Sequence, residues 1–580
     1  MLMRSVCLLA MLLAPLAHAG EMLIETTLAD DGALLVTYTP PAGVTTLRRT
    51  RIDDVSNGFW QNQVRSLDDC AHVDALGIVL RADPPCQRAR LRVEPVLLAR
   101  QATYEGAQPM AGQGVLAFMG YYLIALKGHS LRWRWLPPSG GYVLHQGGLH
   151  HDVAEQVLDS DDVDAALQAL NTPHAWHQLG AQQYIYMGRA PSEALPGGVM
   201  IYDPALDESR RHTIHDMLDV SMRSLAAAYG RWPAGPVGVV VTTSDNPSFH
   251  GDVTEGRMMS LRLPLHPERP QPAAEMQRFI AHEVAHWWNM GVFHSDSHQP
   301  WLHEGHAEWT ALLIMRSQNL MSRGEAVTRL EAALNRCLSV RGGQVAASMN
   351  TAYGRGDDPY ACGLSLMLLG QVQHNAQAAS QTANAGQSQI ERLATLHTVD
   401  HELNVADFSA WADGSTPGTM RQLLLDPNQA FDTGLVRMVN ALGLGQSKPV
   451  QNDTVLPKSV AIGLAEKLMQ TVMAPDCGGS SGFTRLPDAF KLGGRLTCQT
   501  LRLGADVVAL NGIALLTDPL RAWQGFADAC AQHGEVSARP LSIQYRQGLA
   551  TDLACPAVVP SMPLKQLIVL DESALAKAGL

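Results

Sequence analysis

The pattern of hydrophobic and polar residues divides the chain into regions of different texture. From Glu21 to about Arg189, short runs of alternating apolar and polar residues are separated by Gly and Pro, which is typical of β-strands. The segments 34–38 and 184–187 are predicted strands of this kind. This region therefore predicts a β-rich N-terminal domain, and none of its motifs indicates chemistry.

The spacing of apolar residues becomes helical beyond residue 198. Asp207 is a suitable N-cap for a helix that Gly230 can end. Buried strands are predicted at 237–241 and 258–263, and a helix over 273–290 is followed by further helices to about residue 444. Strands before this helix and helices after it predict an α+β domain.

The last region, from about Gln451, alternates again. A glycine-rich loop covers 478–483, and residues 505–510 predict a strand that enters a turn at Asn511-Gly512. Residues 541–545 predict one more strand.

A chain of 580 residues is too long for one hydrophobic core, so we expect a multidomain α+β protein. We expect a signal peptide over 1–19 and a β-rich domain over 20–190. A central domain over 191–446 carries the long helix, and a C-terminal domain covers 447–580.

The first nineteen residues have the organisation of a signal peptide. Arg4 precedes the apolar run 6–16, and Ala17-His18-Ala19 offers small residues at the cleavage site. The alternative is a membrane anchor, which needs about 20 apolar residues, but Pro15 and His18 interrupt this run. The signal peptide leads us to expect export to the periplasm or the medium. No later segment is apolar enough to span a bilayer.

The cysteines agree with an oxidising compartment. Apart from Cys7, eight cysteines fall into four neighbouring pairs along the chain, as local disulfides would. Sequence alone leaves about 105 connectivities open. A zinc-thiolate site is the alternative, but the sequence contains no C-x-x-C motif.

Composition narrows the partners. Hydrophobic residues make up 46% and charged residues 17%, an ordinary globular balance. The net charge of -12 is spread along the chain without a basic stripe, which argues against a nucleic-acid partner.

The predicted helix over 273–290 contains the motif His282-Glu283-Val284-Ala285-His286, an H-E-x-x-H pattern. Residues four apart lie on one face of a helix, so both imidazoles can reach one metal ion. Glu283 lies about 100° around the helix from His282, where it can act on a water molecule as general base. About one chain in twenty-five of this size contains the pattern by chance, so a third ligand is needed to support it.

Glu304 is the candidate third ligand. It lies in the segment 301–309, seventeen residues after His286, which leaves room for a loop and a second helix. Glu308 follows one helical turn later and can accept the free N–H of a ligand histidine. A solvated face is the alternative reading of the two carboxylates, but the flanking tryptophans and alanine argue for burial.

These two segments, H-E-V-A-H-W-W and W-L-H-E-G-H-A-E-W, resemble the gluzincin metallopeptidases, in particular the M1 aminopeptidases and the M61 glycyl aminopeptidases. The resemblance implies a thermolysin-like zinc peptidase domain with a helical lobe and one Zn²⁺ per chain. The M1 motif has eighteen residues before the glutamate of W-L-N-E-G-F-A, whereas this chain has seventeen, with His303 and His306 at the Asn and Phe positions.

The same resemblance implies two further site residues. Tyr360, in Y-A-C-G-L, is similar to the tyrosine of the family segment Y-x-K-G-A, which stabilises the oxyanion. Tyr353 and a core tyrosine remain alternatives. Cys362 replaces the family lysine, which a disulfide to Cys337 would explain. Glu255 lies near the place of the glutamate that binds the substrate's free amine, although a solvated loop carboxylate is the alternative.

The C-terminal region resembles a PDZ domain, with 479–483 as the carboxylate-binding loop and 506–512 as the D-V-V-x-x-N-G segment. That likeness implies a peptide C-terminus as ligand, and a cap without ligand is the alternative. For the whole chain we expect a zinc metallopeptidase acting on peptides or proteins, most consistent with aminopeptidase action. The alternatives are a zinc endopeptidase and a catalytically inactive peptide-binding protein.

Overall fold

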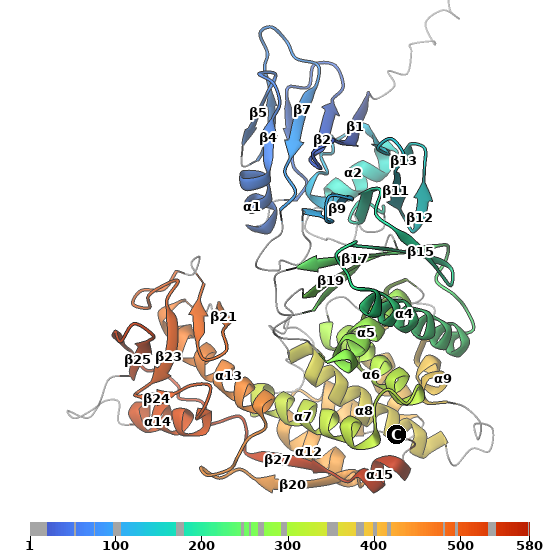
Figure 1. The fold of residues 1–580 in the computed structure, drawn as a ribbon. Coiled ribbons are helices and arrows are strands. Elements are labelled where there is room, and N and C mark those ends of the chain that lie inside the picture. Colours follow the sequence, from blue (N-terminus) through green and yellow to red (C-terminus); the bar gives the residue numbers. More distant parts are fainter. Residues whose placement is uncertain are drawn as a thin grey trace, which may run out of the picture. The chain divides into compact units, whose positions relative to one another are not determined.

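The structure is a computed structural model, shown as a ribbon in Figure 1. It describes residues 20–51, 54–74, 76–96, 106–169, 179–244, 249–254, 257–264, 272–291, 299–344, 358–378, 388–397, 403–414, 419–478, 482–493, 497–531, 541–577 and 579. The chain divides into two compact units, 1–292 and 293–580, and each is described by itself. Within the described residues no helix has both the length and the apolar character needed to cross a bilayer. The predicted signal peptide lies outside the described residues.

The N-terminal part of the first unit consists of three sheets, which confirms the predicted β-rich character. Its strands are β1 (Glu21–Leu28), β2 (Leu34–Thr39), β3 (Thr46–Arg48), β4 (Val64–Ser66), β5 (Ala71–Asp74), β6 (Gly77–Leu80), β7 (Ala89–Val93), β8 (Ala107–Pro109), β9 (Gly114–Phe118), β10 (Ser130–Leu136), β11 (Tyr142–His145), β12 (Gly148–His150), β13 (Ala154–Leu158) and β14 (Tyr184–Gly188). The strand orders are β13-β10-β1-β2-β7-β4, β12-β11-β14-β9-β8 and β3-β6-β5. Two helices that the sequence pattern did not predict lie among them, α1 (Asp54–Gln63) and α2 (Ser160–Gln168).

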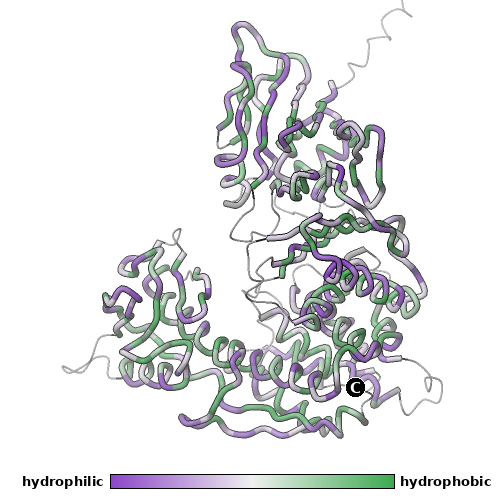
Figure 2. Tube along the Cα trace, viewed as in Figure 1, coloured by the Kyte–Doolittle hydropathy of each residue, from purple (hydrophilic) through white to green (hydrophobic). Residues whose placement is uncertain are grey.

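A mixed five-stranded sheet completes the first unit, in the order β15-β16-β17-β19-β18. Its strands are β15 (Ser192–Leu195), β16 (Gly198–Tyr202), β17 (Val237–Ser244), β18 (His250–Thr254) and β19 (Met258–Pro264). Strands β17 and β19 are buried throughout and are mostly hydrophobic in Figure 2. Val240 and Met258 belong to the core of the N-terminal sheets, so one face of this sheet packs against that part of the unit.

Two long helices accompany this sheet, α4 (Glu208–Tyr229) and α5 (Ala273–Gly291), and they pack against each other. Asp207 caps α4 by accepting the N–H of Arg210, and Gly230 ends it with a φ of 67°. Both ends therefore agree with the prediction, because a carboxylate oxygen satisfies a free N–H and glycine tolerates the left-handed turn.

The second unit begins with a helical layer, as the sequence pattern predicted. Its helices are α6 (Pro300–Ser317), α7 (Arg323–Arg341), α8 (Asp358–Ala378), α9 (Gln389–Ala394), α10 (Val405–Asp413), α11 (Thr419–Leu425) and α12 (Phe431–Ala441). Ser322 and Glu325 form a reciprocal capping box at the start of α7, which fixes where that helix begins.

The remainder of the second unit contains a small sheet and a ribbon. The small sheet joins β21 (Phe483–Arg485), β22 (Phe490–Leu492), β23 (Asp506–Leu510), β24 (Ile513–Ala514), β25 (Leu541–Tyr545) and β26 (Ala550–Leu553), accompanied by α13 (Lys458–Asp476) and α14 (Pro519–Ala531). The ribbon pairs β20 (Gly445–Pro449) with β27 (Gln566–Leu570) antiparallel, and α15 (Glu572–Lys577) follows it. Asn511 and Gly512 adopt φ values of 49° and 81°, the turn that the Asn-Gly pair predicted.

All eight cysteines outside the predicted signal peptide form neighbouring disulfides, as expected. The bonds are Cys70–Cys86, Cys337–Cys362, Cys477–Cys498 and Cys530–Cys555. The architecture is therefore a mixed α/β, multidomain and disulfide-linked one. The boundaries 20–190, 191–446 and 447–580, and the thermolysin-like and PDZ-like assignments, stay predictions.

Candidate metal centre

Helix α5 carries the H-E-x-x-H motif on a fully buried segment. Ile280, Ala281, Val284 and Ala285 have no measurable exposure, and both tryptophans that follow are buried. The polar side chains of the motif are therefore flanked along the helix by buried apolar side chains. His282 and His286 are themselves 4% and 6% exposed.

The two histidines face each other. Their Nε2 atoms lie 3.1 Å apart, and the ring planes are nearly perpendicular, at 84°. Two nitrogen ligands of one zinc ion at a tetrahedral angle lie about 3.3 Å apart, since each Zn–N bond is about 2.0–2.1 Å long. The spacing therefore suits two ligands of a single ion.

Glu304 completes a candidate ligand set. One ligand atom from each of His282, His286 and Glu304 lies within 4.8 Å of the other two. Two imidazoles and one carboxylate form a donor set that catalytic zinc sites use, with a further coordination position left for solvent. On donor chemistry and spacing, these residues fit a zinc ion.

Asn289 orients one of the candidate ligands. Its Oδ1 lies 3.1 Å from Nδ1 of His286, and the Asn289 side chain is completely buried. A carbonyl oxygen at this place accepts the Nδ1–H tautomer, which leaves the Nε2 lone pair for the metal. The sequence analysis assigned no role to Asn289, although its spacing of three residues from His286 on one helix was the available signal.

Glu283 lies against the edge strand β18. A Cβ atom added at Gly251 would be 2.2 Å from Cδ and 2.5 Å from Oε1 of Glu283. The Glu283 carboxyl group therefore occupies the space that any side chain at position 251 would need. It is 6% exposed, so the candidate base is largely shielded from bulk water.

A buried polar network anchors this strand on its opposite face. Asp252 Oδ2 accepts hydrogen bonds from the Tyr184 hydroxyl, at 2.8 Å, and from the Arg262 guanidinium. Arg262 is completely buried, and His250 Nε2 lies 3.4 Å from Asp252 Oδ1. The Tyr184 hydroxyl joins β18 to β14 of the N-terminal sheets, and the charge pair joins β18 to β19, so the backbone against which Glu283 lies is held on this face. Sequence reasoning missed both charged residues.

In the second unit, α6 and α8 approach with their backbones almost in contact. A Cβ at Gly305 would be 2.4 Å from Cα of Gly363, and a Cβ at Gly363 would be 2.2 Å from the Trp301 carbonyl oxygen. Only glycine at both positions allows this crossing. Because Glu304 precedes Gly305 and Tyr360 lies one turn before Gly363, the crossing sets the position of Tyr360 relative to Glu304. Tyr360 is 40% exposed on the first turn of α8.

Helix α7 is tied to both of these helices. Arg329 donates a hydrogen bond of 3.1 Å to Glu308 Oε2 on α6, and Cys337 is bonded to Cys362 on α8. Glu308 is 7% exposed, so it is buried as predicted, with a guanidinium as a partner. The expectation that Glu308 also serves a ligand histidine stays a prediction. The same holds for the role of Tyr360 as a hydrogen-bond donor.

Three predicted features lie outside the described residues. Glu255 follows the last residue of β18 but is not itself described, and most of the glycine-rich loop, 479–481, is likewise outside. The competitor Tyr353 also lies in an undescribed segment.

Comparison with solved structures places the fold. No family model and no curated protein matches the sequence. The chain is similar to the crystal structure of an aminopeptidase N family protein from Idiomarina loihiensis, with a TM-score of 0.52 and 12% identity over 96% of this chain and 99% of that chain. Native yeast LTA4 hydrolase (TM-score 0.37, 11% identity, 78% and 71% covered) and an M1 zinc metallopeptidase from Deinococcus radiodurans (0.35, 16%, 73% and 94%) also match, at scores that carry no argument. At this identity, the first match shows a shared multidomain fold.

Proposed function

We propose that this protein is a zinc-dependent metallopeptidase that hydrolyses peptide bonds, with His282, His286 and Glu304 as metal ligands. The observation that carries the proposal is the grouping of these three donors, whose ligand atoms lie within 4.8 Å of one another. The two histidines belong to a motif whose glutamate, Glu283, is itself buried. The fold shared with an aminopeptidase N family protein supports the same conclusion.

A bound zinc ion supplies Lewis-acid chemistry, since it lowers the pKa of a water ligand to about 7 and polarises a carbonyl oxygen. Glu283 is the general base: its carboxylate takes one proton from the attacking water and delivers it to the leaving amine nitrogen. The C–O bond to the water oxygen forms first and the C–N bond of the peptide then breaks; the second proton of the water also passes to the leaving nitrogen, giving a carboxylate and an ammonium group. Tyr360 donates a hydrogen bond from its hydroxyl to the negative charge that develops on the carbonyl oxygen.

Gly251 and Asn289 help to position the Glu283 carboxylate and the His286 imidazole for this chemistry. Gly251 leaves room for the Glu283 carboxylate, and Asn289 fixes the tautomer of His286. Within the proposal, aminopeptidase action is the more specific part. It rests on the shared fold and on Glu255, which would bind the free amine of the substrate.

Glu283→Gln tests the general base. The variant keeps the metal ligands, so we expect its zinc content, measured by atomic absorption, to equal that of the wild type while hydrolysis is lost. An active variant would exclude Glu283 as the base. A panel of aminoacyl reporter substrates and matched N-acetylated peptides, with and without chelator, then separates exopeptidase from endopeptidase action. Zinc-free protein without any hydrolysis would indicate a peptide-binding protein instead.

We also propose that the protein is exported. The four disulfides between neighbouring cysteines support this, because such bonds persist in oxidising compartments. The C-terminal sheet with α14 is proposed as a PDZ-like module for a peptide C-terminus. Its order of strands around an Asn-Gly turn supports that proposal.

A further inference from the structure

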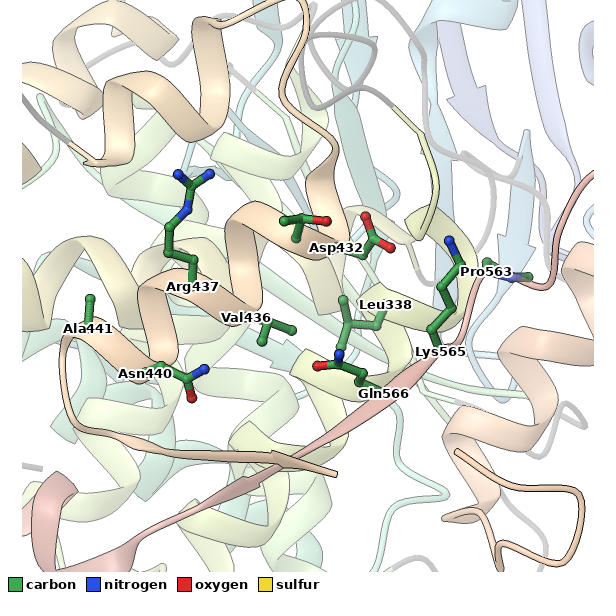
Figure 3. A pocket seen from close by; sticks show the side chains of 10 residues that line it. Leu338, Asp432, Val436, Arg437, Asn440, Ala441, Pro563, Lys565 and Gln566 are labelled. Atoms are coloured by element: carbon green, nitrogen blue, oxygen red, sulfur yellow. The ribbon is translucent and has the colours of Figure 1, made fainter. Parts of the chain in front are cut away.

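A groove of about 660 Å³ lies in the second unit (Figure 3). None of the candidate metal ligands lines it. Helix α12 forms one wall and the start of β27 the other, with Leu338 of α7 between them. Its volume lies within the range of sites that hold small ligands or short peptides. The polar side chains on its walls are those of Asp432, Thr433, Arg437, Asn440, Lys565 and Gln566.

The edge of β27 that faces α7 is capped by side chains rather than by another strand. Asn335 Nδ2 donates to the Ile568 carbonyl oxygen at 2.8 Å, and the Ile568 N–H donates to Asn335 Oδ1 at 2.7 Å. Two residues further on, the Leu570 N–H donates to Glu331 Oε2 at 3.0 Å. The Asn335 carboxamide thus binds the strand as the peptide group of a neighbouring strand would.

The same edge continues uncapped at Gln566. In an antiparallel ribbon, main-chain groups of alternate residues point to the same side, so Gln566 directs its N–H and C=O the same way as Ile568 and Leu570. The bond from the Val450 N–H to the Lys565 carbonyl oxygen, 3.0 Å long, confirms this alternation. Among the described residues, no hydrogen bond reaches the main chain of Gln566 from this side.

Helix α7 explains why the cap is missing. Glu331 and Asn335 lie one turn apart and serve Leu570 and Ile568 in succession. The next turn brings Leu338, which has no polar atom, and the groove opens there. The main-chain donor and acceptor of Gln566 are therefore left for another molecule.

We propose that this groove binds an extended peptide segment that carries a carboxylate. One peptide group of the ligand pairs with the N–H and C=O of Gln566, as the Asn335 carboxamide pairs with Ile568, and so extends the ribbon by strand addition. An apolar side chain of the ligand rests on Leu338 and Val436. Figure 3 shows Lys565 at one end of the groove and Arg437 toward the other.

Charge favours an acidic ligand. Lys565 and Arg437 contribute two positive charges against the single negative charge of Asp432, so the groove has a net charge of +1. Arg437 also donates a hydrogen bond to the Gln429 side chain. The proposal does not depend on the metal centre.

The test uses the full chain and a fluorescent pentapeptide, N-acetylated, with one glutamate and a free C-terminal carboxylate. Binding is measured by fluorescence anisotropy in the presence of a chelator. The chelator prevents zinc-dependent cleavage of the peptide, so the result does not depend on the proposed hydrolytic activity. We expect a dissociation constant of about 0.1 mM, which is ordinary for a short segment bound by strand addition. Gln566→Pro removes the main-chain donor and should weaken binding at least tenfold, whereas Gln566→Ala keeps the donor, removes only a side chain at the wall of the groove and should weaken binding less than about threefold.

A second pair of variants keeps the test independent of the proline. Val436→Trp fills the groove and should abolish binding, while Val455→Trp, at a position 91% exposed and outside the groove, should not. Lys565→Glu should weaken binding of the acidic peptide about tenfold. Equal affinity of the two tryptophan variants would overturn the proposal, and so would absence of binding at millimolar peptide. Self-association of the chain that Val436→Trp abolishes would also overturn it, by showing that a second copy occupies the groove.

Discussion

Replacing Gly251 by alanine is the sharpest test of how the fold positions the general base. The added methyl group would lie 2.2 Å from Cδ, 2.5 Å from Cγ and 2.5 Å from Oε1 of Glu283. Ordinary carbon–carbon contacts are about 3.5–4.0 Å, so the Glu283 carboxyl group must move by more than about 1 Å. The backbone at position 251 is an ordinary strand, which alanine can adopt.

The expected loss follows from that displacement. A misplacement of about 1 Å at a reacting group costs on the order of a hundredfold in rate, equivalent to about 2.7 kcal/mol of transition-state stabilisation. We therefore expect kcat/KM of Gly251→Ala to fall about a hundredfold. Zinc content should be unchanged, because the metal ligands keep their own contacts.

The assay is hydrolysis of an aminoacyl reporter, with zinc content and melting temperature measured on the same preparations. Gly238→Ala is the matched control, since it crowds Met258 and Leu144 on the other face of the same sheet. It should lower the melting temperature but change kcat/KM less than about threefold, because the added methyl group meets Met258 and Leu144 and does not contact Glu283. If Gly251→Ala kept more than half of the wild-type kcat/KM, the position of Glu283 would not limit the reaction and the assigned base would be wrong.

Three further predictions concern separate features. Asn289→Ala removes the acceptor beside Nδ1 of His286 and should weaken zinc binding about 10- to 100-fold in chelator competition; unchanged affinity would contradict the orienting role. Gly363→Ala should force α8 away from Gly305 and lower both the melting temperature and kcat, and an unaltered kcat would show that the crossing does not position the site. Burial, and to a lesser degree the nearby His150, lowers the pKa of His145 to about 4. Between about pH 6.5 and 4, His145 is therefore protonated in the unfolded chain but largely neutral in the folded chain. Stability should therefore fall by about 3 kcal/mol as the pH drops from about 6.5 to 4, and urea unfolding of His145→Gln should lack this part of the pH dependence.

The sequence was most informative where local chemistry decides the structure. Asp207 and Gly230 marked both ends of α4, and the Asn511-Gly512 pair marked a turn, because capping and left-handed φ depend on a few neighbouring residues. The H-E-x-x-H motif predicted the contact between His282 and His286 for the same reason, since helix geometry alone brings residues four apart together.

Features that depend on distant parts of the chain escaped prediction. The pairing of Asp252 with Arg262 follows from the order of strands in the sheet, and Gly251 gains its role only when β18 and α5 are packed together. Likewise, the sequence around Gly305 does not predict its contact with Gly363, because the two glycines meet only where α6 crosses α8. Sequence pattern identifies residue types suited to a site, whereas these contacts require the tertiary fold.

The cap that Asn335 provides for β27 has a consequence for how the polypeptide matures. Asn335 is 1% exposed, and its partner Ile568 follows 233 residues later. During synthesis, the carboxamide has no partner until residue 568 has left the ribosome. Contacts of such long range slow folding, so α7 cannot reach its final contacts before those 233 residues have been made. A stop codon shortly before Gln566 would leave a buried carboxamide without its strand, so the helix that carries Asn335 depends on a strand encoded far downstream.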